Sequence, residues 1–137
     1  MAAFVVDVSA CMPWCCEDEA TALSEELLQR AADRHPLHVP SLWPWEMMNA
    51  VSVAVRRKRI SPEKAASFLE LLSNFDFQIA DAPGVADMPR LSDLAARHQL
   101  TAYDAAYLDL AQRLALPIAT QDDALRKAAT AEGVELL

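Results

Sequence analysis

The segment formed by residues 101–123, TAYDAAYLDLAQRLALPIATQDD, constrains the fold more than any other part of the chain. Thr101 is suited to cap a helix, and Asp104 stands at the capping-box position three residues later. Pro117 then stops the helix and opens a short apolar strand, Ile118-Ala119, which runs into acidic residues. Open α/β sheets bind ligands beyond the carboxyl ends of such strands. The segment therefore predicts a helix, a buried strand and a polar site. The predicted apolar face of the helix comprises Ala105, Leu108, Ala111 and Leu114.

The length and charge of the chain limit its class. Its 137 residues suit a single domain, spanning residues 1–137, with a real hydrophobic core. A net charge of -8 counts against a protein whose main role is to hold duplex nucleic acid, but less against an enzyme whose acids gather at one metal site. The opening MAAFVVD lacks the basic region of a signal peptide, and no apolar run approaches the ~18 residues that span a bilayer. We therefore expect a cytoplasmic protein with no membrane segment and with reduced cysteines.

Short apolar runs alternate with helical patterns along the chain. Strands are predicted at residues 2–6, 37–40, 75–80 and 118–119, with a last edge strand at 134–137. Helices are predicted at residues 17–34, 41–57, 61–74, 88–98 and 123–131, besides the one that begins at Thr101. This alternation predicts an α/β domain with a mostly parallel sheet.

Two further acids stand at positions that suit a site. Asp7 follows the first apolar run, so a buried parallel strand would deliver it at its carboxyl end; the alternative is that Asp7 only caps the next helix. Glu46 and Asn49 lie three residues apart on one helix face, where a carboxylate and an amide would ligate or position a metal. The alternative is an exposed helix acid, but the apolar residues around Glu46 do not favour a solvated position. They are Trp43, Trp45, Met47 and Met48.

Two other clusters have a structural and a functional interpretation. The cysteines Cys11, Cys15 and Cys16 have no nearby His or further Cys to complete a tetrahedral metal set, so buried inert thiols are expected. The basic run from Arg56 to Arg59 suits the carboxyl end of a helix, and a phosphate contact is the other interpretation.

The four acids and their surroundings resemble the PIN-domain nucleases, and in particular the VapC-like toxins of bacterial toxin–antitoxin pairs. Four segments carry the resemblance in family order and together span nearly the whole chain. They are VVDVS (5–9), VPSLWPWEMMNAV (39–51), LTAYDAAYLDLA (100–111) and IATQDDAL (118–125), of which the third is the most specific. The chain departs from the family pattern in its cysteine-rich loop and in the doubled acid after the last of these strands.

The resemblance implies a three-layer α/β/α PIN-like fold and Mg²⁺- or Mn²⁺-dependent cleavage of RNA by metal-activated water. It also implies inhibition by a cognate antitoxin, and we expect a homodimer. The apolar helical face of Leu23, Leu27, Phe68 and Leu72 would either pack in the core or serve such a dimer or antitoxin. The matching catalytic and metal-binding acids are Asp7, Glu46, Asp104 and Asp122, and the supporting residues are Ser9, Asn49, Thr120 and Asp123.

The chemistry of the residues agrees with this expectation. Converging carboxylates repel one another unless a cation is present, and hard oxygen ligands suit Mg²⁺ or Mn²⁺. The sequence shows no Ser-His or Cys-His arrangement for a covalent mechanism. An aspartyl phosphatase needs a second Asp where Ser9 stands, and a receiver domain needs a Lys after a late strand, which is missing here. A non-catalytic interaction module on the same fold stays open. The candidate RNA contacts are Arg56, Arg57, Arg59, Arg113 and Arg126.

Overall fold

The computed structural model describes residues 2–137, and its centre is a four-stranded parallel sheet. The strand order is β3-β2-β1-β4, so β1 lies between two neighbours. In the register, Val5 pairs with His38 on one side and with Ile118 on the other. β1 and β4 are buried along their whole length, as expected for strands covered on both faces. The strands are β1 (Phe4–Val6), β2 (Leu37–Val39), β3 (Phe77–Ile79) and β4 (Ile118–Ala119).

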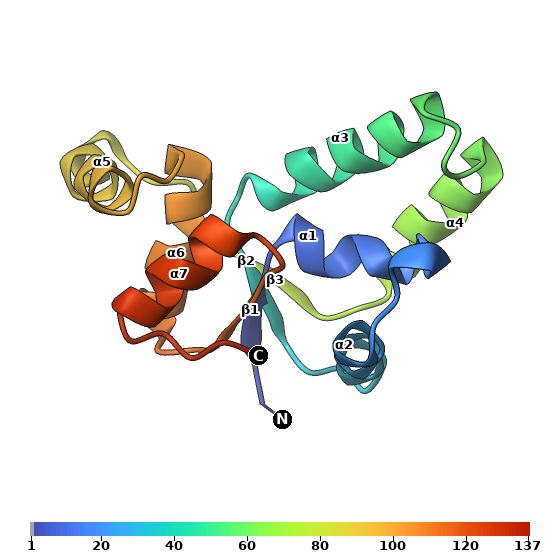
Figure 1. Ribbon diagram of the computed structural model, residues 1–137, viewed down its shortest axis with the longest axis horizontal. Coiled ribbons are helices and arrows are strands. Elements are labelled where there is room, and N and C mark those ends of the chain that lie inside the picture. Colours follow the sequence, from blue (N-terminus) through green and yellow to red (C-terminus); the bar gives the residue numbers. More distant parts are fainter. Residues whose placement is uncertain (1) are drawn as a thin grey trace.

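Helices cover both sides of this sheet, which confirms the predicted three-layer α/β/α fold (Figure 1). α6 and α7 lie on one side of the strands and α2 on the other (Figure 1). α5 packs on the outer side of α6, and α3 with α4 forms a hairpin beyond α1 (Figure 1). The α-helices are α1 (Val8–Cys11), α2 (Ala22–Ala32), α3 (Trp43–Arg56), α4 (Pro62–Ser73), α5 (Met88–Arg97), α6 (Ala102–Leu114) and α7 (Asp123–Ala131). Three single 3₁₀ turns are η1 (Met12–Trp14), η2 (Glu17–Glu19) and η3 (Val85–Asp87).

The predicted helix starts at Ser61 and Thr101 are confirmed by their capping bonds. The Ser61 hydroxyl accepts a hydrogen bond from the Lys64 backbone N–H at 3.1 Å. The Thr101 hydroxyl accepts one from the Asp104 backbone N–H, also at 3.1 Å. α6 ends at Leu114, before the proline that the sequence suggested, because Ala115 adopts a left-handed conformation with φ of 53°.

Three predicted elements differ from the structure. The helix expected over residues 17–34 is split, because Ala20 is extended and Thr21 forms a reciprocal capping box with Ser24 that starts α2 afresh. The helix expected from residue 41 begins at Trp43. The last edge strand is reduced to a single parallel bridge between Leu136 and Ile118.

The buried surface of α6 differs from the predicted apolar face and is wider than it. Leu114 is 40% exposed, whereas Tyr107, Asp109 and Leu110 are buried. The physical reason is that α6 is a central helix, with the sheet on one side and α5 and α7 against its other sides. A helix covered in this way buries more than one stripe of its surface.

The three cysteines are buried free thiols, as the sequence suggested. The Sγ atoms of Cys15 and Cys16 lie 3.7 Å apart, and burial raises the pKa of the Cys15 thiol to about 12. The Cys15 thiol therefore stays protonated and unreactive at neutral pH. Among the described residues, none of the helices has both the length and the apolar character needed to span a membrane.

The apolar face proposed for a partner is mainly core. Leu27, Phe68 and Leu72 are at most 5% exposed, and only Leu23 reaches the surface. Other large apolar side chains that face solvent lie on α3, α4, β3 and α6, and around η3 and the start of α5. The most exposed of them are Val85, Trp45, Tyr103 and Met88.

Candidate active site

The carboxyl ends of β1 and β4 bring Asp7 and Thr120 side by side. Asp7 follows β1 and Thr120 follows β4, and the Asp7 backbone N–H donates to the Ala119 carbonyl at 3.2 Å. Both side chains are almost fully buried, at 6% and 4% exposure. The parallel pairing of the two strands therefore fixes the spacing of the two residues.

The Asp7 carboxylate is held by bonds to both of its oxygens. Its Oδ1 accepts hydrogen bonds from the Ser9 hydroxyl at 2.7 Å and from the Ala10 backbone N–H at 3.0 Å. Its Oδ2 accepts a bond from the Thr120 hydroxyl. Asp7 thus stands at the carboxyl end of β1, as predicted, and also caps α1. Because each carboxylate oxygen has two lone pairs, Oδ2 keeps one lone pair for a ligand.

Ser9 and Thr120 connect Asp7 to the segment that carries Asp122. The Ser9 hydroxyl accepts from the Gln121 backbone N–H at 2.8 Å, and the Thr120 hydroxyl accepts from the Asp122 backbone N–H at 3.1 Å. Oδ1 of Asp122 caps α7 by accepting from the Leu125 backbone N–H at 2.8 Å. One oxygen of Asp122 is therefore fixed by its helix, and the structure gives no protein partner for the other among the described residues.

Glu46 and Asp104 come from helices on different sides of β1. Both stand in the first turn of their helix, and the starts of α3 and α6 flank the carboxyl end of β1 (Figure 1). Oε1 of Glu46 accepts a hydrogen bond from the Tyr107 hydroxyl at 2.5 Å. Both acids are partly buried, which distinguishes Glu46 from the freely exposed helix acid of the alternative interpretation.

The charges of the four acids act on one another across the carboxyl edge of the sheet. Burial raises the pKa of Asp7, and the charge of Asp122 adds to the rise. Burial raises the pKa of Asp104, followed by the charges of Asp122 and Asp7. Burial also raises the pKa of Glu46, as do the charges of Asp104 and Asp7, although the Tyr107 hydrogen bond opposes this rise. Four acids from distant parts of the chain therefore repel one another in one region.

This donor set fits a divalent cation of the hard type. All four groups offer carboxylate oxygens, and their mutual repulsion would be relieved by a bound positive charge. Within residues 2–137, no three Asp, Glu, His or Cys side chains stand close enough together to hold an ion as they are. The residues therefore fit the chemistry of Mg²⁺ or Mn²⁺, and binding would require the side chains to converge.

The candidate RNA-contact arginines are scattered, and one of them contacts the backbone at the end of β4. Arg126 donates to the Thr120 carbonyl at 3.0 Å. Arg113 is engaged by the buried Asp109, and Arg59 pairs with acids near η2. Arg56 and Arg57 stand ten or more residues after Glu46, which is about 15 Å along a helix.

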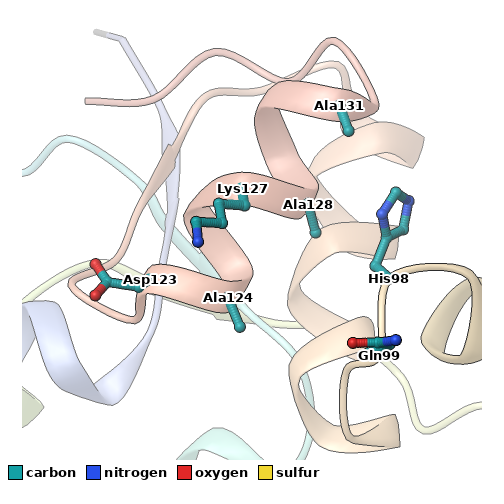
Figure 2. A pocket seen from close by; sticks show the side chains of 7 residues that line it. All are labelled: His98, Gln99, Asp123, Ala124, Lys127, Ala128 and Ala131. Carbon is teal, nitrogen blue, oxygen red and sulfur yellow. The ribbon is translucent and has the colours of Figure 1, made fainter.

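Two of the predicted supporting residues lie at the rim. Asn49 and Asp123 are exposed. A shallow pocket of about 520 Å³ separates α7 from the loop before α6, and Asp123 stands at its edge with its carboxylate turned away from His98 (Figure 2). None of the four acids lines this pocket. His98 Nε2 is hydrogen-bonded to Oε1 of Glu132 at 2.6 Å, which gives it a structural role at the end of α5.

Sequence reasoning missed Tyr107. A buried tyrosine needs a partner for its hydroxyl, and its position three residues after Asp104 placed it on the helix turn that faces the site. The signal was therefore present in the sequence. The partner itself, Glu46, lies 61 residues away and is revealed only by the fold.

Comparisons with known proteins agree with this architecture. The family model described as PIN domain matches residues 4–131. A curated relative, Ribonuclease VapC3 from Pyrobaculum aerophilum, is 30% identical over 121 residues, which are 86% of this chain and 88% of the relative. The crystal structure of PAE2754 from the same organism has a TM-score of 0.71 at 23% identity and covers 93% of this chain and 79% of its own. The crystal structure of FitAcB from Neisseria gonorrhoeae has a TM-score of 0.64 at 16% identity and covers 98% and 96%. The two crystal structures support the fold.

Proposed function

This chain belongs to the PIN-domain family, and from that premise we propose that it is a divalent-metal-dependent endoribonuclease, the toxin of a toxin–antitoxin pair. The relative Ribonuclease VapC3, aligned over most of both chains, supports the choice of RNA as substrate. The proposed reaction is hydrolysis of phosphodiester bonds by water. The protein would act in the cytoplasm, where its substrate is found.

One observation carries this proposal: at the carboxyl edge of the sheet, burial and the charges of neighbouring acids raise the pKa of Asp7, Glu46 and Asp104, and Asp122 is one of the acids whose charge contributes. Repulsion between like charges lowers the stability of the fold, and a bound cation would offset this repulsion. Perturbed acids at a strand-end edge are typical of functional sites in open α/β sheets.

The proposed roles of the residues follow from their bonds. Asp7, Asp104, Asp122 and Glu46 would hold Mg²⁺ or Mn²⁺. When bound, the ion would supply positive charge that offsets the charge of the phosphate and makes water a stronger nucleophile.

The protein's own part is to hold the acids in place. Ser9 and Thr120 orient Asp7, because each donates a hydroxyl hydrogen bond to its carboxylate; burial raises the pKa of Asp7, and these two bonds oppose that rise. The hydrogen bonds of the site leave one lone pair on Oδ2 of Asp7 and one whole oxygen of Asp122 available. Arg126 stands beside Thr120, where its guanidinium would meet a substrate phosphate.

The proposal includes two protein partners, a cognate antitoxin and a second copy of the chain. Exposed apolar side chains support a protein contact on two surfaces, Trp45 and Met48 on α3, and Val85 with Met88 around the start of α5. Sedimentation equilibrium of the purified chain would measure the homodimer directly.

The decisive experiment compares RNA cleavage by the wild type and by Asp104→Asn, with Mg²⁺, with Mn²⁺ and with chelator. We expect cleavage that needs the metal and that falls by about 100-fold or more in the variant. Asp33→Asn is the matched control, because Asp33 follows α2 at the opposite end of the sheet.

The outcomes separate the competing functions. Cleavage that survives both chelator and Asp104→Asn would overturn the metal-site proposal. Clean protein that binds no metal and cuts no RNA would favour the alternative of a non-catalytic interaction module. This alternative is tested because the acids are separated in the structure: no three of the described acids lie at ion-binding distance from one another.

A further inference from the structure

We propose that Tyr107 is a positioning residue that fixes the Glu46 carboxylate relative to Asp104 and so prepares the two acids for a shared cation. This inference rests on the proposed metal-dependent function and adds a residue to it. The observation behind it is the 2.5 Å hydrogen bond from the Tyr107 hydroxyl to Oε1 of Glu46.

The Tyr107 side chain is held in one position by burial. Its side chain is 1% exposed and is the largest of the fully buried side chains. The aromatic ring projects from the central helix α6 into the packed core, so the hydroxyl has little freedom to move. A buried phenol must find a hydrogen-bond partner, and Glu46 is the partner that the fold provides.

The bond between the two side chains has one direction. The Tyr107 hydroxyl donates, and Oε1 of the Glu46 carboxylate accepts. A bond from a neutral donor to a carboxylate is of the strong, charge-assisted kind.

The geometry of α6 relates Tyr107 to Asp104. Tyr107 stands three residues after Asp104, so both face the same side of the helix. One rigid turn of α6 thus carries Asp104 directly and holds Glu46 through the tyrosine. α3, which carries Glu46, packs mainly against α1 and α4, so this bond ties Glu46 to a helix that α3 otherwise touches little.

The bond also limits the freedom of movement of Glu46. Glu46 has three rotatable side-chain bonds in a partly exposed position, and without an anchor it would populate many rotamers. The Tyr107 bond occupies Oε1 and leaves Oε2 for the ion. A hydrogen bond from a neighbouring residue to a metal-binding carboxylate orients that carboxylate and strengthens metal binding.

The experiment measures Mn²⁺ binding to the full chain by titration calorimetry in the absence of RNA. Tyr107→Phe keeps the buried ring and removes only the hydroxyl, and we expect the dissociation constant to rise about tenfold. Tyr103→Phe is the matched control, because Tyr103 lies one turn earlier on α6 and is 65% exposed; its effect should stay within about twofold.

A double variant tests whether the tyrosine acts through Glu46. In a Glu46→Gln background, Tyr107→Phe should add little to the loss of Mn²⁺ affinity, because the carboxylate it positions is already absent. Additive losses would overturn the inference, as would an unchanged affinity in Tyr107→Phe alone. A wild type that binds no Mn²⁺ would overturn the proposed function and this inference together, whereas the other two results leave the proposed function standing.

A second measurement covers the case in which Tyr107→Phe does not fold. The chain has two tyrosines, so 3-fluorotyrosine labelling gives two ¹⁹F resonances. Addition of Mg²⁺ should shift the Tyr107 resonance in the wild type and leave it in place in Glu46→Gln. A Tyr107 resonance that ignores Mg²⁺ in a wild type that binds the ion would overturn the inference.

Discussion

Substitution of Thr120 by Val should lower both the stability and the activity of the protein. The change keeps the shape of the side chain and removes a hydroxyl that makes two bonds inside the site. That hydroxyl donates to the Asp7 carboxylate and accepts from the Asp122 backbone N–H at 3.1 Å. Because Thr120 is only 4% exposed, water cannot easily replace the bond to Asp7.

The size of the effect follows from these bonds. A hydrogen bond to a buried charged group contributes about 1.5–3 kcal/mol, so we expect a loss of about 2 kcal/mol in the free energy of unfolding at neutral pH. The unfolding entropy of a chain of this length is about 0.29 kcal/mol/K, so this loss is a fall of about 7 °C in Tm. Metal-dependent cleavage should fall about tenfold, because Asp7 loses one of the groups that orient it.

The assay is thermal unfolding followed by circular dichroism, without metal at pH 7. Thr130→Val is the matched control, because Thr130 is an exposed residue of α7, and surface changes of this kind stay within about 0.5 kcal/mol. A Tm for Thr120→Val that equals the Tm of the control would refute the argument that Thr120 holds Asp7.

Three other predictions concern pH, packing and substrate binding. The pKa values of Asp7, Glu46 and Asp104 are raised in the folded state, so above about pH 4 the folded state binds more protons than the unfolded state. The free energy of unfolding of the metal-free protein should therefore fall as the pH rises through the pKa values of these acids in the folded state. Saturating Mg²⁺ should reverse this fall by about 2.7 kcal/mol at a hundred times its dissociation constant, and a metal-free Tm that climbs over the same pH range would contradict the charge argument. Asp109→Asn should lower Tm by several degrees while cleavage persists, because two arginines lose their buried partner, and an unchanged Tm would show that this cluster is not structural. Arg126→Ala should weaken RNA binding and reduce its salt dependence by about one counterion; an unchanged salt dependence would remove Arg126 from the RNA surface.

The sequence alone was enough to predict the fold class and the strand ends that Asp7 and Thr120 follow. Short apolar runs ending in Asp7 and in Thr120 predicted parallel strands, because a strand buried on both faces must be apolar and must end where polar residues begin. The caps at Ser61 and Thr101 were readable for the same local reason, since their hydroxyls satisfy backbone groups within three residues.

The errors came from places where local patterns compete. Residues 17–34 read as one helix, yet the Thr21–Ser24 box starts the helix at Ala22. Leu114 read as a core residue, yet the packing of α5 and α7 decides which sides of α6 are covered. The spacing of apolar residues indicates which residues can be buried. Whether they are buried depends on which elements pack against them in the tertiary structure.

The sequence by itself determined the donor chemistry, with four carboxylates and two hydroxyls at readable positions. The tertiary structure alone decided how they are held: that Thr120 donates to Asp7 across 113 residues of chain, and that Tyr107 reaches Glu46. It also decided that Arg126 contacts the backbone of Thr120 at the end of β4, whereas the basic run lies at the far end of α3 from Glu46. The physical reason is that hydrogen bonds and charge interactions act over a few ångströms, and distances of that size between remote segments are set only when the strands pair and the helices pack.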